Sequence, residues 1–582
     1  MGKLIGIFLL ALALCHLSHS EQDWWENGNF YQIYPRSFKD SDGDGVGDLN
    51  GVNEKLEYVK DIGMKGVWLS PIFQSPMADF GYDISNYTNV QPEYGTNEDL
   101  LALIERAHSL GLHLILDFVP NHTSDEHEWF QRSVANDSYY RDFYIWHDGV
   151  INSTTGERQP PSNWISQFRY SAWEWNEQRQ QYYLHQFGVK QPDLNYRNPN
   201  VLEEMNNILR FWLARGIDGF RIDAVPFLFE VEIDPQTGTY PDEPLSSDIS
   251  TCPDPDDWCH LNHTFTNSLP EDFEIIYQWR ELVDQWTREH NTDTKVLLTE
   301  AYTSFENLMH MYGDGLRNGS HVPFNFEMLA GLNNKSSALD FDYYVHHWLS
   351  NMPKGVYANW VLGNHDNPRL ASRFGAQRAD LMNIFLQTLP GIAVTYNGEE
   401  YGLENGYVSW EDTVDPQGCN ADPTTYLQYS RDSERTPFLW DNTKNAGFST
   451  ADRTWLPIGQ SYADNNVAAQ LAAENSHLKI FKQLTQLRQS EAAFIDGSYV
   501  SVVVKNVLVY IRAAETGDKY IVVLNIGDEN VSLNLGTLFD DLSAKLEVVV
   551  SSLHSDIPNG QIVNANSFEA KAYNGYVLRL AI

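Results

Sequence analysis

Short apolar runs alternate with amphipathic segments along most of this chain. We predict strands at residues 30–35, 66–70, 113–117, 216–225, 295–299, 322–326, 360–363 and 392–396. Apolar residues at helical spacing predict helices at 49–62, 97–110, 199–214, 276–290 and 379–389. Strands that alternate with helices form parallel βα units. Eight such units predict an α/β protein built on a (β/α)₈ TIM barrel.

Two stretches depart from this alternation. Residues 121–198 are rich in Trp, Tyr, Ser, Asn and Gln and weakly periodic, which predicts an irregular inserted domain after the third strand. In residues 496–582, runs such as 500–504, 507–511 and 520–524 are separated by turns without helices, which predicts a C-terminal antiparallel β-domain. The barrel then comprises residues 21–120 and 199–495.

Residues 1–20 have the pattern of a cleaved secretory signal peptide. Lys3 precedes an apolar core from Leu4 to Leu14, and the small residues Ser18 and Ser20 follow it. That core is shorter than the roughly 18–20 apolar residues of a membrane span, and no later stretch supplies them. We therefore expect a secreted, extracellular protein without a membrane span.

Composition and charge narrow the class of ligand. The 582 residues are 42% hydrophobic and 13% aromatic, enough for a large core and two or three domains. The 39 Lys and Arg residues stand against 79 Asp and Glu, a formal net charge of −40. This charge argues against nucleic acid or an anionic membrane as partner and leaves small neutral or cationic ligands. The pattern carries no information on oligomeric state.

The chain has four cysteines, of which Cys15 lies in the signal peptide. Cys252 and Cys259 are close in a Pro- and Asp-rich loop, and a secreted chain is expected to join them in a disulfide. Cys419 is left over, either as a buried free thiol or as an intermolecular bridge, and both alternatives stay open.

Sequons for N-linked glycans also fit a secreted protein. Asn121 matches the pattern but lies in a strand-end motif, so we expect it to be unmodified. The predicted glycosylation sites are Asn86, Asn136, Asn152, Asn262, Asn318, Asn334 and Asn530.

Charged residues gather where the predicted barrel strands end. In the fourth strand Arg221 and Asp223 are two residues apart, so both side chains point the same way. A neighbouring guanidinium favours an ionised carboxylate, which a nucleophile must be. The third, fifth and seventh strands lead to His122, Glu300 and Asp366. Each alone has the ordinary explanation of a polar loop residue, but together at a barrel rim they predict one active site.

Four of these stretches resemble the signature regions of the α-amylase clan, glycoside hydrolase family 13. They are DFVPNH at 117–122, GFRID at 219–223, LLTE at 297–300 and NHD at 364–366. QPDLN at 191–195, YNGEE at 396–400 and SRDSERTP at 430–437 resemble the oligo-1,6-glucosidase and α-glucosidase branch. The likeness extends from about residue 24 to the C-terminal β-domain and is closest to the secreted insect maltases.

The resemblance implies a retaining α-glucosidase. Asp223 would attack the anomeric carbon to form a glycosyl-enzyme. Glu300 would protonate the departing oxygen and later activate water, from a carboxyl group about 5–5.5 Å away. Asp366 would bind sugar hydroxyls and strain the ring.

The resemblance also implies how the sugar is held. His122 and His365 would hydrogen-bond it at the cleavage subsite, Tyr82 would stack on it, and Arg221 would accompany the nucleophile. Asp83 and Arg431 would pair to hold the terminal 4-hydroxyl, with Arg435 as the alternative partner, and such a grip makes an enzyme exo-acting. Zinc at the histidines is disfavoured because no zinc-ligand spacing accompanies them.

A candidate cation loop lies near the N-terminus, at DSDGDGVGD, residues 40–48. Its alternating carboxylates suit a hard cation, but Gly51 replaces the bidentate Glu of an EF-hand. The resemblance implies a structural Ca²⁺; the alternative is a solvated acidic turn. The implied ligands are Asp40, Asp42, Asp44, Asp48 and the Val46 carbonyl.

The identity of the substrate depends on finer signals. Ala224 follows the nucleophile where 1,6-specific relatives tend to have Val, so the resemblance implies α-1,4 linkages in maltose, malto-oligosaccharides and sucrose. A transglucosylase or isomerase of the same clan stays open. A non-catalytic ectodomain of the transporter heavy-chain type is disfavoured, because the signal is cleavable and all three acids are present.

Overall fold

A computed structural model describes residues 22–539 and 542–580, so the predicted signal peptide lies outside the described residues. At its centre eight parallel strands form a nearly closed barrel, in the order β13–β12–β11–β5–β2–β1–β15–β14. The predicted barrel is therefore confirmed. In chain order the strands are β1 (Asn29–Ile33), β2 (Gly66–Leu69), β5 (His113–Phe118), β11 (Gly219–Ile222), β12 (Val296–Thr299), β13 (Val322–Pro323), β14 (Asn359–Val361) and β15 (Ile392–Tyr396).

A buried side chain joins the two strands at which the barrel would otherwise be open. Asn359, in β14, donates through Nδ2 to the carbonyl oxygen of Pro323 in β13, at 2.6 Å. Its Oδ1 accepts the backbone N–H of Asn325, at 2.7 Å. One amide thus satisfies backbone groups that have no ladder partner at this seam.

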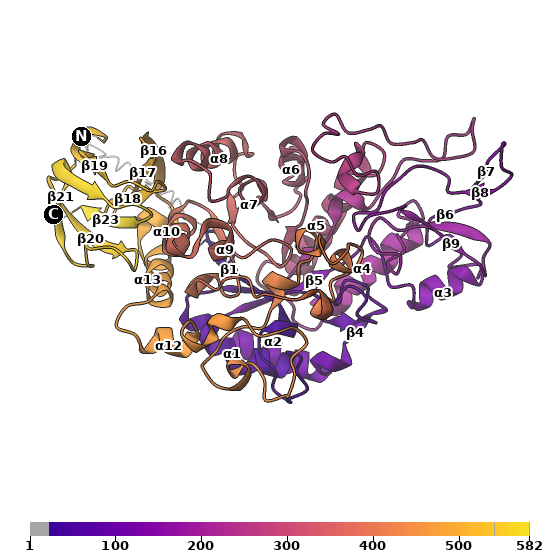
Figure 1. Ribbon diagram of the computed structural model, residues 1–582, viewed down its shortest axis with the longest axis horizontal. Coiled ribbons are helices and arrows are strands. Elements are labelled where there is room, and N and C mark those ends of the chain that lie inside the picture. The colour runs from indigo at the N-terminus through magenta and orange to yellow at the C-terminus, as the bar shows by residue number, and fades with distance from the viewer. Residues whose placement is uncertain (1–21, 540–541, 581–582) are drawn as a thin grey trace, which may run out of the picture.

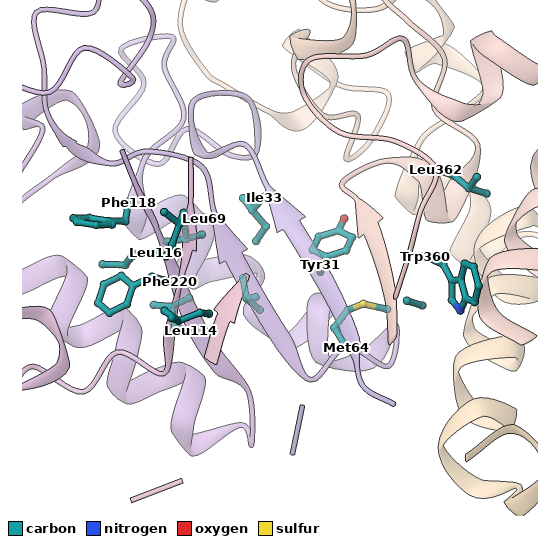
Figure 2. Packing of buried hydrophobic residues seen from close by; sticks show 14 of the residues in the cluster. Tyr31, Ile33, Met64, Leu69, Leu114, Leu116, Phe118, Phe220, Trp360 and Leu362 are labelled. Carbon is teal, nitrogen blue, oxygen red and sulfur yellow. The ribbon is translucent and has the colours of Figure 1, made fainter. Parts of the chain in front are cut away.

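The barrel strands bury both faces. Leu114, Leu116 and Phe118 alternate along β5 and pack in the layer between the barrel and its helices (Figure 2). Ile115 points the other way and shares a second cluster, inside the barrel, with residues that include Leu298. Because neither face meets water, the strands are continuous apolar runs in the sequence.

The helices cover the outside of the barrel and begin where the sequence supplies caps. Thr96 and Asp99 form a capping box at the start of α2. Helix α5 begins six residues before the predicted start, because Pro270 at its first position favours initiation. The main helices are α1 (Leu49–Asp61), α2 (Asn97–Ser109), α4 (Pro199–Leu213), α5 (Pro270–His290), α8 (Ala338–Asn351), α10 (Ala379–Thr388) and α13 (His477–Ser490).

Between β5 and α4 the chain forms two small antiparallel sheets, at one end of the molecule in Figure 1. A long loop after β11 packs on them: Tyr240 shares a core with Trp164 and Trp173. Asn163 and the backbone of Glu243 exchange two hydrogen bonds, of 2.9 and 2.8 Å. The sheets comprise β6 (Trp146–His147), β10 (Gln181–Leu184) and β9 (Trp173–Asn176), and β7 (Val150–Ile151) with β8 (Arg158–Gln159).

The long loop also carries the predicted disulfide. Cys252 and Cys259 are joined, with their Cα atoms 5.9 Å apart. Cys419, at the end of the short helix α11 (Pro416–Cys419), is an exposed free thiol. The alternative of a buried thiol is therefore wrong.

The C-terminal antiparallel β-domain is confirmed and lies at the opposite end of the molecule from the small sheets (Figure 1). Among the described helices, none has both the length and the apolar character to cross a bilayer. The main sheet contains, in spatial order, β16 (Ser498–Val504), β17 (Val507–Ala513), β18 (Tyr520–Asn525), β23 (Gly575–Leu580), β20 (Lys545–Ser551) and β21 (Ile562–Asn564).

Candidate active site

The three predicted acids line one cavity of about 550 Å³. Asp223 follows β11, Glu300 follows β12, and Asp366 lies five residues beyond β14. The carboxyl ends of three separate barrel strands thus bring these side chains to a common space, where TIM-barrel active sites form.

A single buried guanidinium binds three carboxylates at the floor of this site. Nη1 of Arg221 lies 2.9 Å from Oδ1 of Asp117 and 2.5 Å from Oδ1 of Asp223. Its Nη2 lies 3.3 Å from Oε2 of Glu300. Arg221 is only 1% exposed, and its guanidinium lies 5.1 Å from the ring centroid of Trp68. One positive charge does not neutralise three buried carboxylates, so the cluster favours keeping a proton.

The electrostatics of Asp117 and Asp223 agree with this arrangement. Burial raises the pKa of Asp117 to about 6, although Arg221 acts in the opposite direction. Burial likewise raises the pKa of Asp223 above its usual value, against the effect of Arg221 and with that of the Glu300 charge. Only ionised Asp223 can attack as a nucleophile, so the ion pair with Arg221 is the contact that favours its reactive form against the effect of burial.

The backbone after the nucleophile candidate orients Glu300. Ala224 has φ = 50°, a left-handed conformation that is unfavourable for alanine. Its N–H donates to Oε2 of Glu300 at 2.8 Å. Within the described part of the chain, the polar contacts of the Glu300 carboxyl group all involve Oε2, which leaves Oε1 for a ligand.

Two arginines hold Asp366. Its Oδ1 accepts Nη1 of Arg431 at 3.1 Å and Nη2 of Arg435 at 2.8 Å. Its Oδ2 lies 3.3 Å from Nε2 of His365. Burial alone would raise the pKa of Asp366, but His365, Arg431 and Arg435 outweigh it and hold that pKa below its usual value. Asp366 is thus an ionised acceptor, suited to sugar hydroxyls.

The predicted pair of Asp83 and Arg431 is wrong. Arg431 instead places Nη2 2.8 Å from Oδ1 of Asp79 and 2.6 Å from Oδ1 of Asp415. Asp83 is fully buried, and its carboxylate accepts the Ser75 hydroxyl and the N–H groups of residues 78 and 79 at 2.8–2.9 Å. Asp83 therefore fixes the loop that presents Asp79, and Asp79 is the acid that lines the cavity.

His122 lies on the cavity wall as a neutral imidazole. Burial lowers its pKa to about 3. Oε1 of Gln191 accepts the N–H of Gly188 at 2.8 Å, so its Nε2 donates to Oδ2 of Asp79 at 3.2 Å and to Nε2 of His122 at 3.1 Å. Gln191 therefore connects His122 with Asp79, a role that the QPDLN motif at 191–195 does not reveal by itself.

Tyr82 lines the cavity, and His365 lies behind it. Their rings are parallel, with centroids 5.4 Å apart and planes within 3°, and the Tyr82 hydroxyl lies 2.5 Å from Nε2 of His365. Nδ1 of His365 accepts Nε2 of Gln32 at 2.8 Å. His365 is buried and supports the Tyr82 ring, and its expected hydrogen bond to the sugar stays a prediction.

Sequence reasoning missed most of the aromatic wall. These residues belong to loops without periodicity, and no motif distinguished them from core aromatics. The aromatic residues that line the cavity besides Tyr82 are Phe168, Phe187, Phe227, Trp258, Tyr302 and Tyr429.

Outside the cavity, the acidic loop brings three of its predicted ligands together. Oxygen atoms of Asp40, Asp42 and Asp48 lie within 4.8 Å of one another, a donor set that fits a hard cation. Asp44 is not in this group, and its Oδ1 accepts the N–H of Val46 at 2.7 Å.

The sequon asparagines differ in exposure. Asn121 is buried and donates through Nδ2 to the carbonyl of Phe227, which agrees with its expected lack of a glycan. Asn86 and Asn152 are half-buried. The exposed ones are Asn136, Asn262, Asn318, Asn334 and Asn530.

Comparisons with known proteins agree with this geometry. The protein-family model for the alpha-amylase catalytic domain matches residues 32–497 of this chain. The chain is 57% identical to Maltase A1 of Drosophila melanogaster over 96% of each chain. It is 52% identical to a salivary alpha-glucosidase of Aedes aegypti over 99% of this chain and 98% of that one. The solved structure of XgtA, an alpha-glucosyl transfer enzyme, superposes with a TM-score of 0.83 at 32% identity, over 96% of this chain and 100% of that one.

The position of Asp83 gives a test of its role. We expect Asp83→Ala to lower the free energy of unfolding by about 2–4 kcal/mol, because three buried donors lose their acceptor. Urea denaturation measures this, with Asp464→Ala at an exposed carboxylate as the control. Unchanged stability together with loss of activity would return Asp83 to the sugar-binding role.

Proposed function

The chain belongs to the α-amylase family and is an α-glucosidase, and from this premise we propose a secreted, retaining exo-α-glucosidase. It removes terminal α-1,4-linked glucose from maltose, malto-oligosaccharides and sucrose. The observation that carries the proposal is the convergence of Asp223, Glu300 and Asp366 on one cavity, with Asp223 and Glu300 on the two terminal nitrogens of Arg221.

In the proposed mechanism Asp223 attacks the anomeric carbon and forms a glycosyl-enzyme. Its Oδ1 is bound to Arg221, and Oδ2 receives no hydrogen bond from the described residues, so Oδ2 is the attacking atom. Glu300 gives its proton to the departing oxygen and then takes one from water. Asp366, which is bound by two arginines, accepts hydrogen bonds from hydroxyls of the same glucose, and these hydrogen bonds become stronger as the sugar ring flattens.

The end of the cavity supports exo action. Asp79 and Arg431 are paired and both line the cavity, so they replace Asp83 and Arg431 as the pair that binds the terminal 4-hydroxyl. Burial raises the pKa of Asp79 to about 6, against the effect of Arg431. Near neutral pH Asp79 is therefore mostly ionised and can accept a hydrogen bond from the hydroxyl.

Two finer points complete the proposal. Secretion is supported by the N-terminal sequence and by relatives named for saliva. Glycans are expected at the exposed sequons. The convergence of the three acids disfavours a purely non-catalytic ectodomain.

A second candidate is transfer of glucose to another sugar. Its support is the likeness to XgtA, which is named as an alpha-glucosyl transfer enzyme. The same covalent intermediate serves both reactions, and the products formed from concentrated maltose distinguish them.

We expect Asp223→Asn to lower kcat on maltose by more than about 100-fold, because losing a nucleophile raises the barrier by several kcal/mol. Glucose release from maltose, sucrose, isomaltose and p-nitrophenyl α-glucoside is the measurement. Asp452→Asn, at an exposed carboxylate, is the control. A variant at position 223 that keeps more than about a hundredth of the activity would disprove the assignment.

We also propose that the acidic loop binds a structural Ca²⁺. Asp40, Asp42 and Asp48 supply the convergent oxygens, and Asp44 and the Val46 carbonyl are the further predicted ligands. The ion would neutralise carboxylates that otherwise repel one another.

Chelator-treated protein should therefore release or absorb heat when titrated with Ca²⁺ and should melt at a higher temperature with Ca²⁺, because a ligand of the native state stabilises it. Asp42→Asn should weaken both effects. Absence of a binding heat together with unchanged melting would reject the site.

A further inference from the structure

The cavity wall holds one more acid to which no role has yet been given, Glu434. It lies in the 3₁₀ turn η9 (Asp432–Arg435), between the two arginines that bind Asp366. It lines the cavity although it is only 3% exposed. A nearly buried carboxyl group on a substrate cavity needs either a protein partner or a ligand.

The protein satisfies only half of this carboxyl group. Nδ2 of Asn405 donates to Oε2 of Glu434 at 3.3 Å. The orientation of that amide is fixed at its other end, because its Oδ1 accepts the N–H of Arg369 at 2.7 Å. Among the described residues, Asn405 is the only side chain that hydrogen-bonds the Glu434 carboxyl group, and the other contact is with the backbone N–H of Glu434 itself, so the carboxyl group can still bind a ligand in the cavity that it lines.

The surrounding charges indicate a neutral ligand. Arg431 and Arg435 are already bound to Asp366, and Arg431 also to Asp79 and Asp415, so Glu434 is not needed as their counter-ion. Burial raises the pKa of Glu434 to about 8, although Arg435 opposes the rise. Near neutral pH the group is a protonated carboxyl, which donates and accepts, as a sugar hydroxyl does.

The contacts of Glu434 place it on one side of the cavity. Asn405 connects it to Arg369, which follows Asn367 and Pro368 on the cavity wall. Nδ2 of Asn367 in turn donates at 3.0 Å to the hydroxyl of Tyr302, which is 43% exposed and lies two residues after Glu300. Through Tyr302, this part of the cavity wall is connected to the segment that carries Glu300, the proposed proton donor to the departing oxygen.

We propose that Glu434 is a specificity-determining residue that hydrogen-bonds, through Oε1, a hydroxyl of the sugar on the leaving-group side of the scissile bond. This inference rests on the proposed α-glucosidase function and adds to it a residue that recognises the departing sugar. The contact matters for maltose, whose leaving group is glucose. It is absent for p-nitrophenyl α-glucoside, whose leaving group carries no hydroxyl at that place.

Glu434→Ala removes the contact, and Glu434→Gln keeps the size, the neutrality and the capacity to bind both Asn405 and a hydroxyl. We expect Glu434→Ala to lower kcat/KM for maltose by about 3- to 10-fold, the effect of one hydrogen bond. For the aryl glucoside it should stay within about 2-fold. Glu434→Gln should stay within about 3-fold on both substrates. Glu404→Ala, an exposed acid beside Asn405, should change neither.

Each other result contradicts the inference. An equal loss on both substrates in Glu434→Ala would place Glu434 at the glucose subsite or in a structural role. Unchanged maltose cleavage in Glu434→Ala would show that no contact is made. If Glu434→Ala does not fold, as judged by its melting curve, a selective loss on maltose must instead appear in Glu434→Leu, and its absence there overturns the inference. Wild-type protein that cleaves neither substrate would overturn the proposed function itself, and the inference with it.

Discussion

The charge of Arg221 is the constraint on which the site depends. It is buried beneath the cavity, and its two terminal nitrogens bind Asp117, Asp223 and Glu300. A buried guanidinium is stable only with carboxylates around it, and buried carboxylates are stable only with such a partner or with protons. The fold therefore keeps Asp223 and Glu300, the two acids of the proposed mechanism, close together on one guanidinium.

The rest of the architecture maintains this geometry. Parallel strands present Arg221, Asp223 and Glu300 at one end of the barrel, and the buried amide of Asn359 joins the seam between β13 and β14. The left-handed backbone of Ala224 is unfavourable in itself but supplies an N–H to Glu300. A second group of charges, Arg431 and Arg435 with Asp79, Asp366 and Asp415, fixes the side of the cavity where we propose that the terminal glucose binds.

Much of the barrel and the meeting of three acids in one cavity could be predicted, because the patterns behind both are local in sequence. Apolar runs such as the one at 113–117 become strands whose ends must meet, and Arg221 and Asp223 share a face by period alone. Asp79 was missed because Asp83, four residues later, is an equally plausible partner for Arg431 by motif. Only the three-dimensional structure of the loop shows that the Asp83 carboxylate already accepts hydrogen bonds from the Ser75 hydroxyl and two backbone N–H groups. The packing of Tyr240 on the inserted sheets was likewise invisible, because that loop has no periodicity and contacts residues about 70 positions away.

The most direct test of the account is to identify the residue that becomes covalently attached to the sugar. A slow fluorinated α-glucosyl donor, followed by peptide mass spectrometry, reports that residue. The account predicts a mass increase of one fluoroglucosyl unit on the peptide that contains Asp223, at Asp223 itself. Labelling of another carboxylate, or turnover of the donor to the inverted anomer without a covalent adduct, would contradict it.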